Sequence, residues 1–195
     1  IAYTFISPNG ERTFATYLGA AAMMAPDNID GSMFEGYDYL YVEGYLVQNH
    51  ALILRAVELA KYMGLKICLD LASYNVVEAD KEFFNLLLTE YVDIVFANET
   101  EAKALTGKEP REALDEIAAM CKIAVVKLGP DGSMVKCNAD AGFYKIEPYP
   151  ANCIDATGAG DIYAAGFLYA HSLGMPVEVC GKVGSIISSK VVEVI

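Results

Sequence analysis

The chain has 195 residues, a formal net charge of −12 and a hydrophobic fraction of 54%. Its length suits one domain, and its apolar content is sufficient for a buried core. The negative charge argues against nucleic acid and against an anionic membrane surface as partners, because both attract lysine and arginine. A chain of this charge that binds an anionic ligand must concentrate positive potential locally, through helix N-termini, a few lysines or a metal ion.

The cysteines indicate the compartment. They are five in number, widely spaced and without a C-x-x-C pair, and the chain has two histidines. We expect free, mostly buried thiols in a reducing compartment and no zinc site. No apolar run is long enough to span a bilayer, and the short apolar stretch 18–25 lacks the basic residues that precede the apolar core of a signal peptide. These features predict a cytoplasmic protein with no membrane partner.

Strands and helices alternate along the chain. Apolar runs and turn residues predict strands over 4–7, 13–17, 39–42, 65–71, 91–97, 123–128, 133–137 and 143–147. Helical periodicity predicts helices over 47–63, 78–88, 99–105, 111–120 and 158–173, and Pro176 is expected to open another. Gly64 and Gly174 are expected to end helices, and Asn9-Gly10 to turn a hairpin.

This alternation predicts an α/β fold. The middle strands are almost continuously apolar, as strands are when both faces of a parallel sheet are covered. We therefore expect three layers: a largely parallel central sheet with helices on both faces, plus antiparallel hairpin additions at the start of the chain and near 133–147. Ligands of such sheets bind beyond the carboxyl ends of the strands.

The run 155–161, D-A-T-G-A-G-D, stands at the start of the helix expected over 158–173. Glycine lets backbone approach a ligand closely, and a helix N-terminus presents N–H groups to a phosphate or a developing oxyanion. Asp161, on the same turn, could take a proton from the group that attacks that phosphate. The alternative is an ordinary helix start, in which Asp155 or Thr157 caps the helix and Asp161 complements its dipole. The residues alone leave both interpretations open.

Two further runs follow expected strands. Asn98 and Glu101 belong to N-E-T-E, which opens a helix directly after the apolar strand 91–97. Alone, this pair is better explained as a capping box, with Asn98 at the N-cap and Glu101 at N3. Lys127 begins K-L-G-P-D-G, whose Pro-Asp-Gly could be a plain turn between two strands. The ammonium of Lys127 could aid phosphate binding. Alternatively, Lys127 could serve only to pack the aliphatic part of its side chain in the sheet.

Single residues are candidates as well. Asp70 ends a buried strand, where an acid is usually functional or paired. Arg12 could meet an anion, although an exposed charge on a hairpin is the simpler interpretation. Ser185 lies among small residues of a late helix, which could equally serve helix packing. The alternating tyrosines that include Tyr39 and Tyr41 are better explained by packing within a strand than by stacking on a ligand.

In this order, the runs resemble the motifs of the ribokinase-like, or PfkB, carbohydrate kinases. Residues 155–161 and the small-residue helix that follows are similar to the family's C-terminal signature, from which Ala156 is a mild departure. Residues 98–101 are similar to its Asn-x-x-Glu motif, and 127–132 to a strand-end loop that lines the nucleotide site. Residues 9–13, N-G-E-R-T, resemble the hairpin beside its substrate lid. The resemblance covers nearly the whole chain.

The resemblance implies an ATP-dependent phosphotransferase that phosphorylates an alcohol group of a sugar or sugar-like substrate, or of a nucleoside. Asp161 would accept the proton of the attacking hydroxyl as the catalytic base. The backbone N–H groups of Gly158, Ala159 and Gly160 would stabilise the charge on the transferring phosphoryl group.

The resemblance also implies how the ligands are held. Asn98 and Glu101 would organise Mg²⁺ through its water shell, and a K⁺ site would lie near Asp155 and Thr157. The residues implied for the nucleotide are Asn98, Glu101, Lys127, Gly129, Gly132, Thr157 and Ser185. The residues implied for the substrate are Arg12, Asp70 and Asp161.

At the level of the whole protein, the resemblance implies one kinase domain over residues 1–195, incomplete, with residues 1–17 as a hairpin beside the lid. A homodimer through the lid is common in the family but not in its nucleoside branch. The sequence begins at Ile1 without a methionine and residues 191–195 are largely apolar, so we expect it to be part of a longer protein that carries the family's Gly-Gly substrate segment before Ile1.

Two alternatives differ in class. The first is a nucleotide-binding homologue without catalysis, against which the retained Asp161 counts. The second is a dinucleotide-binding oxidoreductase, which would place G-x-G-x-x-G after the first strand of a β-α-β unit. Here the glycine-rich turn comes late in the chain, after an expected hairpin, and its glycines lack that spacing.

Overall fold

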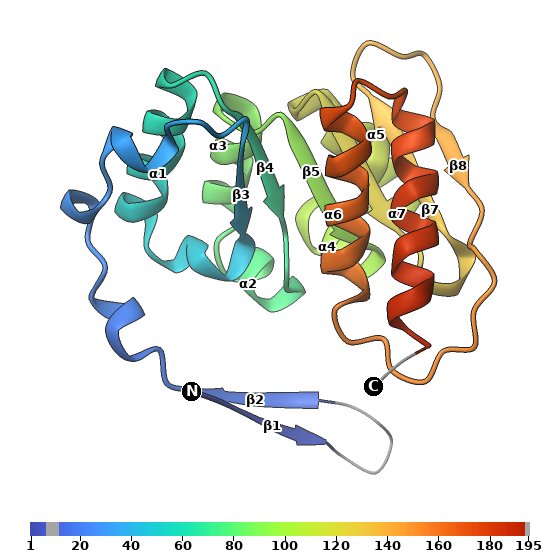
Figure 1. Ribbon diagram of the computed structural model, residues 1–195, viewed down its shortest axis with the longest axis horizontal. Coiled ribbons are helices and arrows are strands. Elements are labelled where there is room, and N and C mark those ends of the chain that lie inside the picture. Colours follow the sequence, from blue (N-terminus) through green and yellow to red (C-terminus); the bar gives the residue numbers. More distant parts are fainter. Residues whose placement is uncertain (7–11, 194–195) are drawn as a thin grey trace.

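The computed structural model describes residues 1–6 and 12–193. At the centre of this part is a six-stranded sheet whose strands follow chain order from β3 to β8, so that each lies beside the next (Figure 1). Strands β3 to β6 are parallel, and β7 and β8 are antiparallel additions at one edge. The strands are β3 (Tyr39–Glu43), β4 (Lys66–Asp70), β5 (Ile94–Asn98), β6 (Ile123–Lys127), β7 (Ser133–Cys137) and β8 (Tyr144–Ile146).

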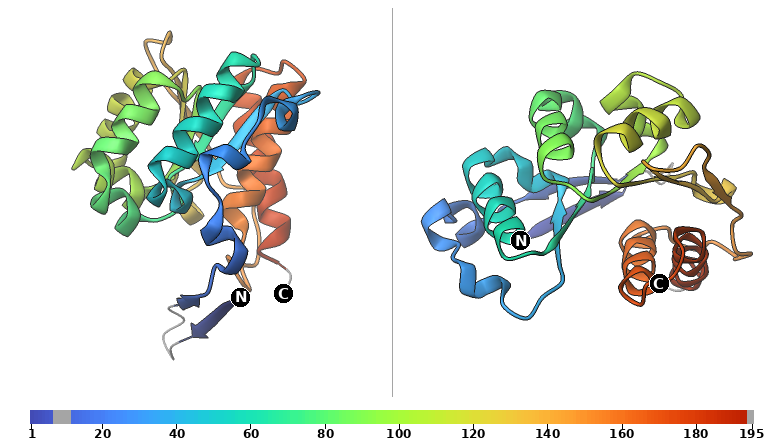
Figure 2. Two further views of the ribbon diagram at one scale, coloured as in Figure 1. Left: turned by 90° about the vertical axis from the view of Figure 1, so that its left-hand side faces the viewer. Right: turned by 90° about the horizontal axis from the view of Figure 1, so that it is seen from above.

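Helices cover both faces of this sheet. Helices α1 to α5 lie against one face and α6 and α7 against the other, as the view from above shows (Figure 2). The helices are α1 (His50–Tyr62), α2 (Tyr74–Ala79), α3 (Lys81–Glu90), α4 (Glu99–Thr106), α5 (Pro110–Met120), α6 (Ala159–Ser172) and α7 (Val177–Val191). The predicted three-layer α/β fold with a largely parallel sheet is confirmed.

Strand β5 shows why the middle strands are continuous apolar runs in the sequence. Val95 and Ala97 join the hydrophobic cluster on the α1–α5 side, whereas Ile94 and Phe96 join the cluster on the α6–α7 side. Phe96 meets Phe167 of α6 edge to face, with ring centroids 5.4 Å apart. Because both faces of the strand are buried, a polar side chain finds water only at its ends.

Two expected helices are divided in the structure. The range 47–63 begins with the last two residues of the 3₁₀ helix η4 (Gly44–Gln48) and continues as α1, which Asn49 caps by accepting a hydrogen bond from the N–H of Leu52 at 3.2 Å. The range 78–88 falls on α2 and α3, which meet at Asp80, where the backbone is not helical and the carboxylate pairs with His50. At the first break the Asn49 side chain bonds to the backbone in competition with a continuous helix, whereas Asp80 at the second break bonds to a side chain of another helix. The other 3₁₀ helices are η1 (Gly19–Met23), η2 (Pro26–Asn28), η3 (Gly31–Phe34) and η5 (Gly129–Asp131).

The start of the chain forms a separate two-stranded sheet. Strands β1 (Ala2–Ile6) and β2 (Arg12–Thr16) pair antiparallel and project from the body of the molecule (Figure 1). The expected turn at Asn9-Gly10 lies outside the described residues. Tyr3 and Phe5 are 64% and 60% exposed and share one face of their strand. Within the described ranges, no helix is long and apolar enough to cross a membrane.

The loop between β6 and β7 contains two glycines with positive φ, Gly129 at 55° and Gly132 at 88°. A Cβ on Gly129 would meet nothing within 4 Å. A Cβ on Gly132 would lie 2.0 Å from the carbonyl oxygen of Ile146, because β8 passes directly beside it. The glycine at 132 is therefore required by packing as well as by its dihedral angle.

We predict that Gly132→Ala destabilises the fold more than Gly129→Ala. Alanine at 129 costs about 1–2 kcal/mol for its left-handed backbone. Alanine at 132 adds a steric clash with β8, worth about 1–3 kcal/mol more. Urea unfolding of both variants measures the difference, and equal losses of unfolding free energy would contradict this view of the loop.

Candidate active site

The carboxyl ends of four parallel strands meet in one cleft of about 470 Å³. The last residue of each strand lines it: Glu43 of β3, Asp70 of β4, Asn98 of β5 and Lys127 of β6. Glu43 is directly opposite Asp70 in the strand register, and Asn98 is opposite Lys127. The cleft thus lies where ligands of open α/β sheets bind. Its other lining residues are Tyr45, Ala72, Glu101, Gly160 and Asp161.

The first turn of α6 closes one side of the cleft. Gly158 precedes the helix with φ 76°, a left-handed conformation suited to glycine, and Asp161 is the third residue of the helix. The N–H of Ala159 donates to the carbonyl of Ala156 at 3.2 Å. The structure brings Gly160 and Asp161 into the cleft beside the strand ends, as the motif interpretation requires.

The side-chain cap in the alternative interpretation of this run is wrong, although Asp161 does lie in the first turn of the helix, as that interpretation expected. Gly158 occupies the N-cap, and the helix has no side-chain cap hydrogen bond. The carboxylate of Asp155 instead accepts hydrogen bonds from the N–H and the hydroxyl of Thr157, at 2.9 and 2.7 Å. Asp155 and Thr157 thereby shape the turn that leads into the helix, and neither lines the cleft.

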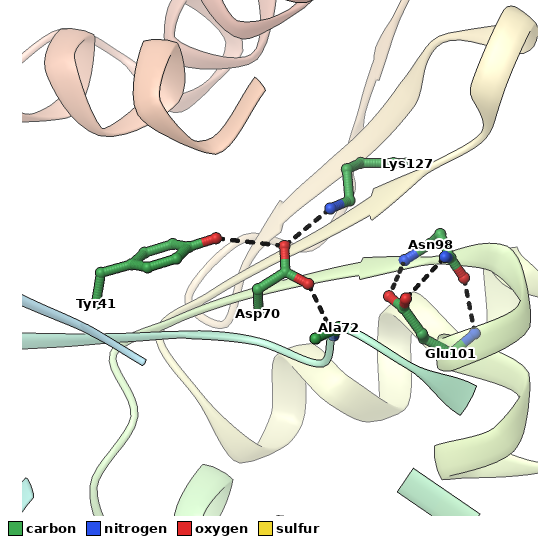
Figure 3. A network of polar contacts seen from close by, with 6 residues as sticks. All are labelled: Tyr41, Asp70, Ala72, Asn98, Glu101 and Lys127. Carbon is green, nitrogen blue, oxygen red and sulfur yellow. Dashed lines mark hydrogen bonds and ion pairs between the residues drawn. The ribbon is translucent and has the colours of Figure 1, made fainter. Parts of the chain in front are cut away.

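Asn98 and Glu101 form a capping box and also line the cleft. The Asn98 side chain accepts from the N–H of Glu101 at 2.9 Å, and the Glu101 carboxylate accepts from the backbone and side-chain N–H groups of Asn98, each at 2.8 Å (Figure 3). Glu101 is 4% exposed, and this burial raises the pKa of its carboxyl, opposed by the bond from the Asn98 backbone. The two interpretations of this pair are therefore compatible.

Asp70 and Lys127 form a buried ion pair across the strand ends. The Lys127 ammonium donates to Oδ2 of Asp70 at 2.9 Å, and Tyr41 donates to the same oxygen at 3.4 Å (Figure 3). Oδ1 of Asp70 accepts from the N–H of Ala72 at 2.9 Å. Ala72 has φ 60°, which is uncommon for a residue with a side chain and marks a constrained turn at the cleft.

Sequence reasoning missed Glu43 and the polar role of Tyr41. Burial, followed by the charges of Asp70 and Asp161, raises the pKa of the Glu43 carboxyl. Tyr41 packs its ring near Phe96, with centroids 6.4 Å apart, so packing was the right interpretation for its ring but not for its hydroxyl. The position of Glu43 in the sequence could have identified it as a candidate, because Glu43 ends an apolar strand just as Asp70 does.

Several predicted ligand residues lie outside the lining of the cleft. Ser185 holds the segment after β8, accepting from the N–H of Tyr149 at 3.1 Å and donating to the carbonyl of Glu147 at 3.3 Å. Gly129 and Gly132 shape the β6–β7 loop described above, and Arg12 begins β2. Their proposed contacts with ligands stay predictions.

The five cysteines are all within the described residues and all free, as expected. Three of them are buried, Cys68, Cys121 and Cys180. Burial is the first cause that raises the pKa of the Cys68 and Cys121 thiols, each to about 12, so neither is a reactive thiolate at neutral pH.

Comparison with known proteins identifies the family of the chain. Over residues 1–195 the chain matches the pfkB family carbohydrate kinase. The chain belongs to this family. The PfkB resemblance of the sequence motifs is confirmed, and the oxidoreductase alternative has no support from the site, whose glycine-rich turn follows the whole parallel sheet.

Relatives of this PfkB chain include kinases of sugars and of a nucleoside. It is 27% identical to an uncharacterized sugar kinase of Archaeoglobus fulgidus, over 98% of this chain and 76% of that protein. A solved structure of a probable sugar kinase from Rhizobium etli has a TM-score of 0.90 at 32% identity, and adenosine kinase from Sinorhizobium meliloti has 0.89 at 33%. Each covers this whole chain, which spans 60% and 61% of their respective lengths.

We predict that Glu43→Gln raises the thermal stability of the protein at neutral pH. The folded-state pKa of Glu43 lies above its ordinary value of 4.5, so stability is lost as the pH rises through that raised value. Glutamine has nearly the same shape as glutamate but no charge, so the variant avoids this loss of stability. Each kcal/mol gained in unfolding free energy should raise Tm by about 2–4 °C.

Differential scanning calorimetry between pH 4 and pH 8 tests this, with exposed Glu35→Gln as the control. The gain of Glu43→Gln should shrink toward the acid end of the range. A gain that is equal at both ends, or one that Glu35→Gln reproduces, would contradict the pKa shift.

Proposed function

We propose that the chain forms most of the catalytic domain of an ATP-dependent kinase that phosphorylates an alcohol group of a sugar or of a nucleoside. The observation that carries the proposal is the position of Asp161, which shares one cleft with Asn98, Glu101 and Lys127. A carboxylate base, a helix N-terminus and groups for a metal–nucleotide complex are the parts that phosphoryl transfer needs, because it depends chiefly on positioning and electrostatics.

In the proposed reaction, the acceptor hydroxyl oxygen attacks the γ-phosphorus of ATP. A new P–O bond forms to the acceptor, and the bond from the γ-phosphorus to the bridging oxygen breaks, with its electron pair leaving on ADP. The hydroxyl proton passes to the carboxylate of Asp161. Asp161 stands at the first turn of α6, so the proton acceptor and the phosphate-binding helix end belong to one rigid element.

The proposed anion hole is the N-terminal turn of α6. Helix N-termini present N–H groups without intrahelical partners and the positive end of the dipole. Gly160 lines the cleft and has no side chain to keep a phosphate away. Gly158 takes the left-handed conformation that starts the helix. Ala159 would have to exchange its bond to Ala156 for one to phosphate.

The donor set fits Mg²⁺ held through water. Both carboxylate oxygens of Glu101 already accept a hydrogen bond from Asn98, and each has a second lone pair that can accept from a metal-bound water. When bound with ATP, Mg²⁺ would neutralise phosphate charge, and this would also favour the ionised form of Glu101. A K⁺ site near Asp155 and Thr157 is a further proposal, supported by their place in the turn before α6.

The paired strands β1 and β2 are the proposed lid-side hairpin. Their apolar face carries Tyr3 and Phe5, both exposed, and we propose that a second copy covers it in a homodimer. We further propose that the chain is part of a single kinase domain and that its substrate is a small molecule. We also propose a cytoplasmic, reducing compartment, which the free cysteines support.

We predict that Asp161→Asn lowers kcat by about 10²–10⁴-fold in the complete protein, because the hydroxyl proton then has no base. ATP binding, measured by calorimetry, should stay within a few-fold of wild type. A coupled ADP-release assay measures turnover with ribose, fructose, 2-keto-3-deoxygluconate, adenosine and other nucleosides.

Exposed Asp27→Asn, which does not line the cleft, is the matched control and should turn over normally. Turnover of Asp161→Asn close to wild type would refute the base. ATP binding by the wild type without ADP release for any acceptor would favour the non-catalytic homologue instead.

The dimer is tested separately. Light scattering should find two copies of the wild-type protein, and Tyr3→Ser with Phe5→Ser should give a monomer, because the exposed apolar face loses its driving force for association. A monomeric wild type would contradict the dimer and would favour a nucleoside as the acceptor.

A further inference from the structure

The charge of the cleft is unbalanced. Among the described residues that line it, Lys127 is the only basic one. The acidic residues that line it are Glu43, Asp70, Glu101 and Asp161. A cleft that receives a polyphosphate needs positive charge at the reacting centre, and here the strand end of β6 supplies it.

Stability alone does not account for the ion pair of Lys127 with Asp70. Their side chains are only 16% and 6% exposed. Removing two charges from water carries a large desolvation cost, and well-packed apolar residues in place of such a pair often give a protein that is as stable or more stable. A buried pair at the edge of a binding cleft therefore indicates a role for its charge.

Lys127 is held against the first turn of α6. A Cβ on Gly160 would lie 3.0 Å from Nζ of Lys127, so the ammonium lies directly beside the first turn of α6. An ammonium has three N–H donors, and the bond to Asp70 uses one of them. An oxyanion bound at this turn would lie beside the remaining donors.

Asp70 is oriented by three donors from three parts of the chain. They are the ammonium of Lys127, the hydroxyl of Tyr41 and the N–H of Ala72. The sequence resemblance implied that Asp70 binds the substrate directly. A carboxylate with these three partners is better suited to fixing the ammonium of Lys127 than to binding a substrate hydroxyl. Its position at the end of β4 places the ammonium between the sheet and α6.

We propose that Lys127 is a catalytic residue that donates to the oxygens of the transferring phosphoryl group, and that Asp70 is a positioning residue that aims it. This inference rests on the proposed kinase function. Lys127 keeps its protons throughout, since the acceptor proton goes to Asp161, and its fixed charge opposes the charge that spreads over the phosphoryl oxygens in the transition state.

A double-mutant cycle in the complete protein tests the proposal. The variants are Lys127→Met, Asp70→Asn and both together, each measured for kcat and for the KM of ATP and acceptor. Lys127→Met should lower kcat by about 10²–10³-fold, as loss of one transition-state donor does. Asp70→Asn should lower kcat by about 10-fold and leave the acceptor KM within about 3-fold, since it acts through Lys127.

The combined variant separates the two roles of Asp70. If Asp70 acts through Lys127, the double variant is no slower than Lys127→Met, because the second change removes nothing that remains. If the two effects multiply and Asp70→Asn raises the acceptor KM, Asp70 is a substrate ligand and the positioning role is overturned. Lys127→Met turnover near wild type would overturn the catalytic role.

The controls separate chemistry from folding. Lys122 pairs with Asp93 at the other end of β6, so Lys122→Met removes a lysine–aspartate pair outside the cleft and should leave kcat unchanged. Lys127→Met leaves the buried carboxylate of Asp70 without its counter-charge and lowers stability, whereas the double variant removes both charges. If Lys127→Met does not fold, the double variant should still show the 10²–10³-fold loss, and normal turnover there overturns the proposal. A wild type without ADP release refutes the kinase function itself.

Discussion

The parallel alignment of β3 to β6 is the constraint on which the site depends. Backbone hydrogen bonding in register brings the last residues of four strands to one edge, with Glu43 opposite Asp70 and Asn98 opposite Lys127. Because strands β4 to β6 are buried on both faces, their interior positions carry apolar side chains. The polar residues therefore collect where the strands end, and residues far apart in the chain share one cleft.

The second constraint is the close packing of α6 and α7 on the sheet. A Cβ on Gly166 would lie 3.1 Å from Cα of Gly184, and one on Gly184 would lie 2.8 Å from the carbonyl of Tyr163. These glycines let the two helices approach each other, so the small residues of α7 have a packing role. Phe167 anchors α6 on Phe96. The helix that carries Asp161 is thereby fixed relative to the strand ends, as the proposed role of Asp161 as catalytic base requires.

Much of the fold could be predicted because its signals are local. Neighbouring residues are enough to identify the continuous apolar strands, the glycines that end helices and the D-A-T-G-A-G-D run. The order of these features along the chain then matched the order of the family motifs. The helix breaks at Asn49 and Asp80 could not be predicted from periodicity, since they depend on side-chain hydrogen bonds and on the partner of Asp80, which lies in another helix.

The site was predictable in its parts but not in its connections. Asp70, Asn98, Glu101, Lys127 and Asp161 were identified as candidates, and the structure brings all of them to one cleft. The pairing of Asp70 with Lys127 depends on strand order, which no single motif encodes. Glu43 was missed because a lone acid after an apolar strand has no motif around it, although its register partner is Asp70.

The central claim is that this cleft transfers a phosphoryl group from ATP to an alcohol. Phosphorus NMR of the complete protein, mixed with ATP, Mg²⁺ and the acceptor panel, tests it directly because it observes the transferred atom. The γ-phosphate signal of ATP should decay while a phosphomonoester signal of the acceptor grows in equal amount. Decay that yields only inorganic phosphate, or no decay with any sugar or nucleoside, would contradict it.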